Sequence, residues 1–273
     1  MAVQVRRSQT KKRMASSIRK PIHNASEPKV SVVIPVMNER RTLAAVIRQA
    51  HRVHAQTEVI VVANGSTDGS GKLAKRMGAR VITYNFPLGH DVGRSIGAAA
   101  AKGDMILFTD GDIVIPTYRL VPFIHALEKG DVDVALNKYL GSVKKSNVHS
   151  VVLAKHALNT FIDSTRLKGA SLTTIPHAIN RKALEQIGVA NLAVPPLAQA
   201  IAKYKNLKMQ SVQFVEVGKS NPIRRSRRKG LRMDPLERLI MGDHLEAIHW
   251  FIHQTSPRGI YSDLGRMRET VRE

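Results

Sequence analysis

The chain has 273 residues and a formal net charge of +22, from 43 Lys and Arg against 21 Asp and Glu, and it contains no cysteine. This composition excludes disulfides and thiolate metal sites, and no uncharged apolar stretch of about 18 residues is present to form a membrane-spanning helix. The charge indicates a surface that attracts the phosphates of nucleic acid, anionic lipid or nucleotide. Two basic segments, 5–21 and 218–232, are either solvated or in contact with an anionic membrane face.

Along the chain, apolar runs rich in β-branched residues alternate with segments of helical spacing. Residues 1–29 are polar, basic and without periodicity, which predicts a flexible arm. We then expect strands at 30–35, 58–63, 79–84, 104–109 and 132–137, with helices near 43–53, 70–77, 93–102 and 117–129. This alternation predicts an α/β, Rossmann-like fold with a mostly parallel sheet and helices on both faces.

The second half of the chain is less regular. We expect a helix at 148–163, then a short strand, a turn and a short helix within 169–188, a strand at 211–217 and an amphipathic helix at 234–254. Six apolar residues of the last helix are expected to share one side: Leu236, Leu239, Ile240, Ile248, Phe251 and Ile252.

Polar side chains follow the carboxyl ends of three expected strands, where ligands of open α/β sheets bind. They are Asn38 and Glu39, the stretch 64–68, and the pair Asp110 and Asp112. Two neighbouring carboxylates coexist as anions when a cation lies between them and a third group, and hard oxygen ligands suit Mg²⁺ or Mn²⁺. The stretch "LFTDGDIVI" therefore predicts a metal–diphosphate site, the alternative being a tight turn that uses Asp and Gly for their backbone tolerance.

Three stretches in this half resemble, in order and spacing, the nucleotide-sugar half of family 2 glycosyltransferases with the GT-A fold: "VSVVIPVMNERRTL", "VIVVANGSTDGS" and "GDMILFTDGDIVI". The wider resemblance includes polyprenyl-phosphate sugar transferases and glucosyl-phosphoglycerate synthases. It implies a single GT-A domain that consists of the arm at 1–29, a nucleotide-sugar-binding half at 30–140, and an acceptor-binding half with the C-terminal helix at 141–273.

The resemblance also implies which residues bind the nucleotide sugar: Pro35, Asn38, Glu39, Asn64, Ser66, Asp68, Arg94, Asp110 and Gly111. Asn64 stands where the family usually has an acid that holds the uracil or ribose, and an asparagine can still hydrogen-bond a base edge. Asp110 and Asp112 match the Asp-x-Asp motif. In that motif the second aspartate binds the metal directly, and the first contacts ribose or metal-bound water.

The family pattern breaks where inverting members carry a Glu-Asp pair whose aspartate deprotonates the acceptor. The sequence has no acidic residue between Glu185 and Glu216. A base could come from elsewhere, with Asp243, His177 and His244 as candidates. Alternatively, the leaving phosphate assists a reaction that retains configuration, or the protein binds nucleotide sugar with little turnover.

Two of these histidines have further interpretations. His244 is either a core histidine or, as in related GT-A enzymes, a ligand that joins Asp110 and Asp112 on the metal. His177 is either near the sugar and acceptor or a plain turn residue. The basic cluster at 224–229 would close over the diphosphate or face the acceptor.

We therefore expect a glycosyltransferase, a hexosyltransferase in particular, that uses Mn²⁺ or Mg²⁺ and a nucleoside-diphosphate sugar such as a UDP-sugar. Its acceptor would be phosphorylated, lipid-linked or a polysaccharide. We expect it in the cytoplasm, with peripheral contact to the inner membrane face as an option. The alternatives are a basic nucleic-acid-binding protein, which an aromatic content of 4% disfavours for single strands, and a nucleotidyltransferase, which would need a glycine-rich loop after the first strand.

Overall fold

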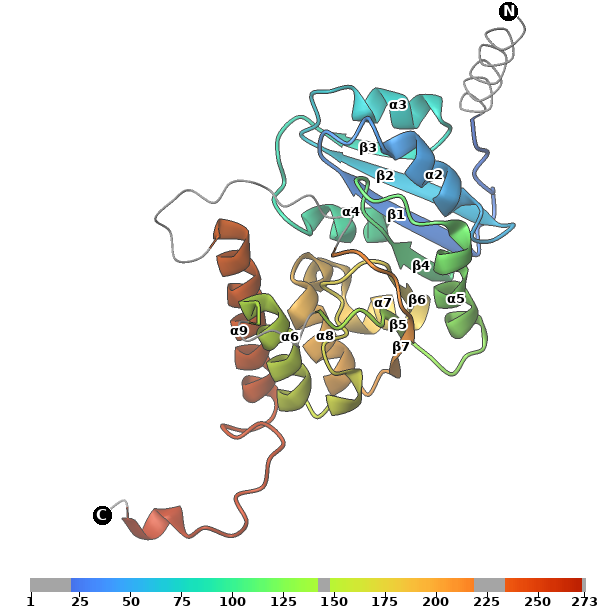
Figure 1. The fold of residues 1–273 in the computed structure, drawn as a ribbon. Helices are drawn as coiled ribbons and strands as arrows, with labels where there is room; N and C mark the ends of the chain where they lie inside the picture. The colour runs from blue at the N-terminus through green and yellow to red at the C-terminus, as the bar shows by residue number, and fades with distance from the viewer. Residues whose placement is uncertain (1–20, 142–147, 219–233, 272–273) are drawn as a thin grey trace, which may run out of the picture.

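The computed structural model describes residues 21–141, 148–218 and 234–271, which form a seven-stranded sheet with helices on both faces (Figure 1). In chain order the strands are β1 (Val30–Val36), β2 (Thr57–Asn64), β3 (Arg80–Tyr84), β4 (Met105–Phe108), β5 (Val134–Asn137), β6 (His177–Asn180) and β7 (Met209–Gln213). Their order in the sheet is β3-β2-β1-β4-β6-β5-β7. Only β6 runs antiparallel to its neighbours among the described strands. The mostly parallel α/β fold is therefore confirmed.

Each face of the sheet has its own apolar core, because successive side chains of a strand point to opposite faces. In β1, Val32 and Ile34 belong to one core and Val33 to the other. The first core is covered by α2 (Leu43–His51), α3 (Ser70–Arg76) and α5 (Thr117–Glu128). The second is covered by α4 (Val92–Ala100), α6 (Ser150–Phe161), α7 (Arg181–Ile187), α8 (Pro195–Tyr204) and α9 (Pro235–Gln254). Short 3₁₀ helices lie at Thr165–Leu167, Val189–Ala193 and Arg268–Val271.

Small residues allow α4 to lie directly on the sheet. A Cβ atom on Gly97 would lie 2.2 Å from a methyl carbon of Val33, and one on Gly93 would lie 2.9 Å from Cβ of Pro35. Any side chain at these positions would push the helix away from β1. The close approach brings the first turn of α4, which carries Arg94, to the carboxyl ends of the central strands.

Two predictions for the second half of the chain are wrong in detail. Within 169–188 the turn comes first, and β6 then runs directly into α7, so that His177 begins a strand. The strand expected at 211–217 is β7 at Met209–Gln213, because its pairing with β5 shifts register and ends there.

The prediction that six apolar residues share one buried side of α9 is also only partly right. Phe251 is buried, but Leu239 is 47% exposed. The buried positions of this helix are His244, Ala247 and Phe251, because α9 packs against α6 and α8 along a narrow stripe.

The prediction of a flexible arm at 1–29 extends too far along the chain, because residues 21–29 pack against the domain. The backbone N–H of Ile22 donates to the carbonyl of Met77 at 2.7 Å. The Asn24 side chain accepts a hydrogen bond from the N–H of Val59 and donates one to its carbonyl. Residues 1–20 lie outside the described part of the chain.

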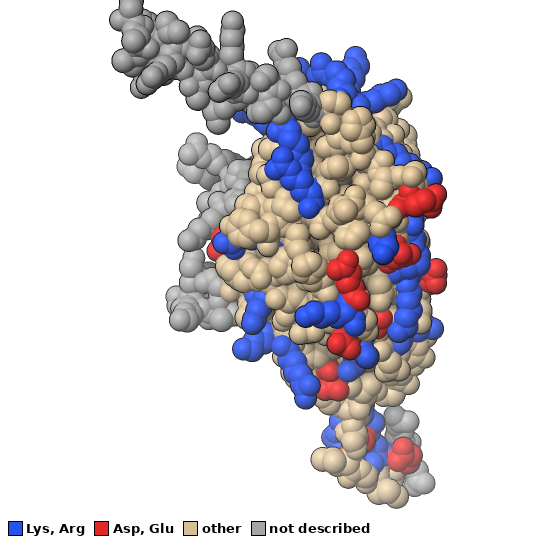
Figure 2. All heavy atoms as spheres, turned by 90° about the vertical axis from the view of Figure 1, so that its right-hand side faces the viewer, with Lys and Arg blue, Asp and Glu red and all other residues tan. Residues whose placement is uncertain are grey.

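Lys and Arg side chains are spread over the face drawn in Figure 2, with Asp and Glu side chains among them near its middle. Much of the positive charge belongs to segments outside the described residues, including the basic cluster at 224–229. Of all the Asp and Glu residues of the chain, only Glu273 lies in those segments. Among the described helices, none has both the length and the apolar composition that crossing a membrane requires.

Candidate active site

The loops that follow β1 and β2 are joined by the side chain of Asn38. Its Oδ1 accepts hydrogen bonds from the backbone N–H groups of Thr67 at 2.8 Å and Asp68 at 3.2 Å. Its own N–H donates to the Ser66 hydroxyl, which in turn donates to the carbonyl of Val36. Asn38 has a φ of 63°, a left-handed conformation that asparagine tolerates better than most residues. Two of the predicted nucleotide-binding residues, Asn38 and Ser66, are therefore brought together and fix the loops.

The carboxylate of Asp68 completes this connection. It accepts hydrogen bonds from the N–H of Arg40 at 3.0 Å and from the N–H and hydroxyl of Ser70 at 2.9 and 2.6 Å. Burial raises the pKa of Asp68, but the hydrogen bonds from Ser70 and Arg40 outweigh it, so the pKa lies below its ordinary value. Asp68 therefore remains ionised at neutral pH.

Asn64, at the end of β2, holds the loop that leads into α4. Its Oδ1 accepts from the N–H of Leu88, and its Nδ2 donates to the carbonyl of Gly89 at 3.3 Å. A carboxylate could accept the first bond but could not donate the second. Gly65, with a φ of 63°, lets the chain pass closely, because a Cβ there would lie 2.7 Å from the backbone nitrogen of Pro87. Both the oxygen and the nitrogen of the Asn64 side-chain amide thus have a backbone partner.

The Asp110–Gly111–Asp112 turn lies against the loop after β1. The Thr42 hydroxyl donates to the carbonyl of Gly111 at 2.6 Å. A Cβ on Gly111 would lie 3.0 Å from a methyl carbon of Val36 and 3.4 Å from Cβ of Glu39, so the absence of a side chain lets the turn lie closely against this loop. The turn therefore places Asp110 and Asp112 beside Glu39, as expected for one ligand site at the carboxyl ends of β1 and β4.

The donor set of this turn fits a divalent metal. Asp110 and Asp112 are half-buried and offer hard carboxylate oxygens, and Mg²⁺ commonly takes only one or two protein carboxylates beside water and phosphate. Within the described residues, no group of three or more His, Asp or Glu side chains is arranged to hold a metal. The expected combination of His244 with Asp110 and Asp112 is therefore not assembled.

Arg94 is the cation of the site, and it is almost completely buried. Its guanidinium lies 2.7 Å from a carboxylate oxygen of Asp91 and 3.3 Å from one of Asp110. Burial lowers the pKa of Arg94, but Asp91 and Asp110 more than compensate, so the pKa lies above its ordinary value. Arg94 is therefore a buried part of the site and not a solvated surface residue.

His177 lies in the core under the site. It is 2% exposed, pairs with Phe108 across β6 and β4, and stacks on its ring with centroids 4.9 Å apart. Its Nδ1 lies 3.2 Å from the carbonyl of Thr174 and therefore donates to it. Burial, and secondarily the charge of Arg94, lowers the pKa of His177 to about 3. A neutral, enclosed imidazole is poorly suited to take a proton from an acceptor.

The other two candidate bases are neighbours on α9. Burial, and then the negative charges of Asp91 and Glu246, raise the pKa of Asp243 to about 6. His244 donates from Nδ1 to the carbonyl of Ile240 at 2.7 Å, which leaves a lone pair on Nε2. That nitrogen is buried without a hydrogen-bond partner in the described part of the chain, and burial lowers the pKa of His244. The electrostatic coupling of Asp243 to Asp91 links α9 to the Arg94 ion pair.

Sequence reasoning missed Asp91, Lys155 and Thr174. Asp91 precedes the N-terminus of α4 and could have been found from its i, i+3 spacing to Arg94, a separation at which helical side chains meet. Lys155 of α6 donates to the Thr174 hydroxyl at 2.7 Å. No local signal marks Lys155 and Thr174, which are 19 positions apart.

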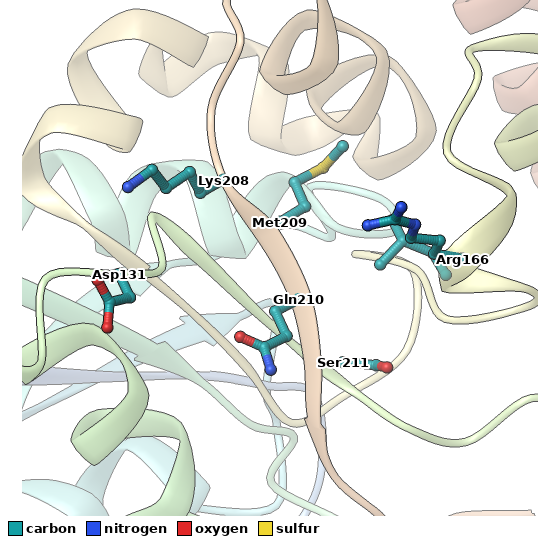
Figure 3. Close-up of a pocket in the computed structure, with 7 residues that line it drawn as sticks. Asp131, Arg166, Lys208, Met209, Gln210 and Ser211 are labelled. Atoms are coloured by element: carbon teal, nitrogen blue, oxygen red, sulfur yellow. The ribbon is translucent and has the colours of Figure 1, made fainter.

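A separate hollow lies at the outer edge of the sheet (Figure 3). It measures about 390 Å³ and is lined by Asp131, Arg166, Leu167, Lys208, Met209, Gln210 and Ser211. These residues come from β7 and the residue before it, the connection before β5 and a 3₁₀ helix, and they include none of the predicted site residues. The hollow is therefore distinct from the strand-end site.

The sheet topology and the carboxylate–arginine site at the ends of its central strands define an α/β protein of the GT-A type. The sequence model described as "Glycosyl transferase family 2" matches residues 31–188, which is more than half of the chain. The protein belongs to this family.

Curated relatives match parts of the chain. It is 26% identical to the 4,4'-diaponeurosporenoate glycosyltransferase of Staphylococcus haemolyticus over 171 residues, which cover 56% of this chain and 44% of the relative. It is 33% identical to the glucosyl-3-phosphoglycerate synthase of Mycobacterium tuberculosis over 106 residues, which cover 35% of this chain and 32% of the synthase. The chain therefore matches less than half the length of these relatives.

The fold itself is shared over a longer stretch. The crystal structure of the Mycobacterium tuberculosis synthase with Mn²⁺, UDP-glucose and phosphoglyceric acid has a TM-score of 0.57 to this chain at 19% identity. The match covers 81% of this chain and 80% of that one. This likeness shows a common architecture.

Proposed function

We propose that this chain is a metal-dependent glycosyltransferase that moves a sugar, a hexose in particular, from a UDP-sugar to an acceptor. One observation carries the proposal: in a member of family 2, the Asp110–Gly111–Asp112 turn meets the buried Arg94 at the carboxyl end of β4. The solved synthase with the same fold was crystallised with Mn²⁺ and UDP-glucose. A UDP-sugar is therefore the first donor to test with this chain.

Asp112 and Asp110 would hold the Mn²⁺ or Mg²⁺. Such an ion, when bound, neutralises the diphosphate that leaves with the nucleoside. Arg94 adds a fixed positive charge beside Asp110, and Asp91 holds its guanidinium in place. Charge that is positioned before the reaction stabilises a developing anion without reorganisation.

The nucleotide would lie over the loops that follow β1 and β2. In this proposal Pro35, Glu39 and Gly111 form the wall next to the metal, while Asn38, Ser66 and Asp68 present the outer rim. The hydrogen bonds among Asn38, Ser66 and Asp68 fix these loops before the ligand arrives. A preformed rim reduces the ordering that binding requires. Asn64 would contribute by holding the 86–91 loop.

Asp243 is the better candidate for the base that the family's missing Glu-Asp pair would supply. A carboxyl group with a pKa of about 6 is ionised at neutral pH and more basic than an ordinary aspartate. His177 is enclosed and has a pKa of about 3. If neither is needed, the departing phosphate takes the proton and configuration is retained.

Two relatives indicate the class of acceptor. One relative is a glucosyl-3-phosphoglycerate synthase, and another, from Edwardsiella ictaluri, is an undecaprenyl-phosphate 4-deoxy-4-formamido-L-arabinose transferase with 30% identity over 111 residues. We propose a phosphorylated or lipid-linked acceptor on this basis. A lipid-linked acceptor would be reached by peripheral contact of the basic surface with an anionic membrane.

Sugar release from a panel of UDP-sugars, with Mn²⁺ or Mg²⁺ and after chelation, tests the proposal. We expect release only with metal, and we expect Asp112→Asn to abolish it. Asp163→Asn is the matched control, because Asp163 is an exposed acid just after the C-terminal end of α6 that pairs with Lys203. Release by the Asp112 variant at the wild-type rate, or no release and no metal-dependent UDP binding by the wild type, would refute the assignment.

A further inference from the structure

Lys155 is a half-buried lysine that comes from α6, on the acceptor half of the chain. Its ammonium donates to the hydroxyl of Thr174 at 2.7 Å. α6 packs against α9, and the charge of Lys155 acts on His244 of that helix, so the ammonium lies near α9 and the segment before β6. Its side chain is therefore held in one place, with a hydroxyl as its neighbour.

This ammonium has no carboxylate partner in the described part of the chain. Lys182 and Lys203 each pair with an aspartate within 4.0 Å, whereas no such ion pair forms at Lys155. Every acidic residue of the sequence except Glu273 belongs to the described residues. Burial, and then the charge of Arg94, lowers the pKa of Lys155 to about 8, with only Asp91 acting in the opposite direction. A cation removed from water and left without an anion is unfavourable.

The position of Thr174 shows where the missing anion belongs. β6 runs antiparallel to β4, and His177 at its start pairs with Phe108, two residues before Asp110. The residues just before His177, including Thr174, therefore lie at the same end of the sheet as the Asp110–Asp112 turn. The charge of Arg94 acts on both Lys155 and His177, which is consistent with this placement.

We propose that Lys155 and Thr174 form an anion-binding subsite that takes a phosphate or carboxylate group of a substrate. The ammonium would pair with the anion, and the Thr174 hydroxyl, which accepts from Lys155, would donate its own proton to it. This inference rests on the proposed function for the identity of the substrates. The acceptor's anion is the expected occupant because both residues belong to the acceptor half, and the donor's diphosphate is the other source of the same chemistry.

The test uses the full chain with inorganic phosphate as the probe, with and without saturating UDP and Mg²⁺. Phosphate affinity is measured by calorimetry for the wild type, Lys155→Met, Lys155→Arg and the matched control Lys203→Met. We expect Lys155→Met to weaken phosphate binding at least tenfold, Lys155→Arg to retain most of it, and Lys203→Met to resemble the wild type. Circular dichroism confirms that each variant is folded.

The two sources of the anion give different results. If phosphate still binds the wild type when UDP and Mg²⁺ are saturating, the subsite serves the acceptor. If UDP and Mg²⁺ displace phosphate and Lys155→Met also weakens UDP binding tenfold, it serves the donor's diphosphate. If a folded Lys155→Met binds both phosphate and UDP like Lys203→Met does, the subsite does not exist.

A second readout does not depend on turnover. Without ligand, Lys155→Met should melt at a higher temperature than the wild type, because it removes an unpaired half-buried charge; Thr174→Val should melt lower. Saturating phosphate should raise the melting temperature of the wild type but not that of Lys155→Met. The inference would be overturned if Lys155→Met melted below the wild type and if phosphate raised its melting temperature by as much as it raises that of the wild type. If phosphate binding depends on Lys155 while no UDP-sugar is used, the subsite stands and the proposed function fails.

Discussion

The carboxylate of Asp91 lies 2.7 Å from the guanidinium of Arg94, and both side chains are almost completely buried at the start of α4. The same guanidinium reaches Asp110 at 3.3 Å. Arg94 therefore connects a buried acid to the first aspartate of the Asp-Gly-Asp turn. Its position is fixed by the protein and does not require a ligand.

Replacing Asp91 by Asn should destabilise the fold, because it leaves the buried Arg94 with only the more exposed Asp110. Breaking a buried pair from one side typically costs about 3 kcal/mol. Urea unfolding should show a loss of this size. The double variant Asp91→Asn, Arg94→Met should lose clearly less free energy of unfolding than the two single variants lose together. Fully additive losses would mean that the two residues are not coupled. The exposed acid Asp163, changed to Asn, should alter stability by less than about 0.5 kcal/mol.

Replacing Asn64 by Asp should loosen the loop that leads into α4. The new carboxylate would face the carbonyl of Gly89 without a proton to donate, and an unsatisfied buried group costs about 1–3 kcal/mol. The loss in melting temperature should shrink at low pH, where the protonated acid can donate. Asn206→Asp, on an exposed turn, should show neither effect. A loss that is equal at pH 5 and pH 7 would show that the bond to Gly89 is unimportant.

Replacing Gly97 by Ala should push α4 away from the sheet. The added methyl group would lie 2.2 Å from Val33, and overpacking of this kind costs about 1–3 kcal/mol. Adding Val33→Ala should recover part of the loss in free energy of unfolding. Gly242→Ala on α9 is the matched control, because open space surrounds that position, and helix propensity should make it slightly stabilising. An equal response at both glycines would contradict the packing argument.

The stability of the protein should fall as the pH is lowered below the pKa of an unfolded histidine. The unfolded chain binds a proton at His177 near pH 6.5, whereas the native state resists protonation until about pH 3. Stability therefore decreases from pH 6.5 towards pH 3, in the direction that proton linkage requires. His177→Gln keeps an N–H donor without titrating and should flatten the curve of unfolding free energy against pH. The exposed His249, changed to Gln, should keep the wild-type slope; the same slope in both variants would remove His177 as its cause.

The first half of the fold was predictable because its signals are local. Strands β1, β2, β4 and β5 are buried and largely apolar runs, and β3 is a β-branched run at the edge of the sheet. The helices between them show clear spacing. The rule that ligands bind at the carboxyl ends of parallel strands also grouped Asn38, Asn64 and Asp110 correctly in space. These inferences needed no knowledge of which strands are neighbours.

The other features of the fold and of the site depend on contacts between segments that are far apart in the sequence. β6 has four residues, and nothing in "HAIN" indicates that it runs antiparallel between β4 and β5. The buried stripe of α9 follows from its packing on α6 and α8 and not from its apolar pattern alone. Lys155 owes its environment to Thr174, 19 positions away, so the sequence gives no direct sign of it, whereas the pairing of Asp91 with Arg94 follows from local spacing.

The antiparallel insertion of β6 also has a consequence for synthesis on the ribosome. β4 is complete at Phe108, but its outer edge stays uncovered until residues 177–180 emerge. During that interval the nascent chain presents the unpaired backbone groups of a hydrophobic strand, which is the kind of edge that promotes aggregation. A chain that terminates between β5 and β6 should therefore be insoluble, whereas one that ends after α8 should already have its vulnerable edge protected.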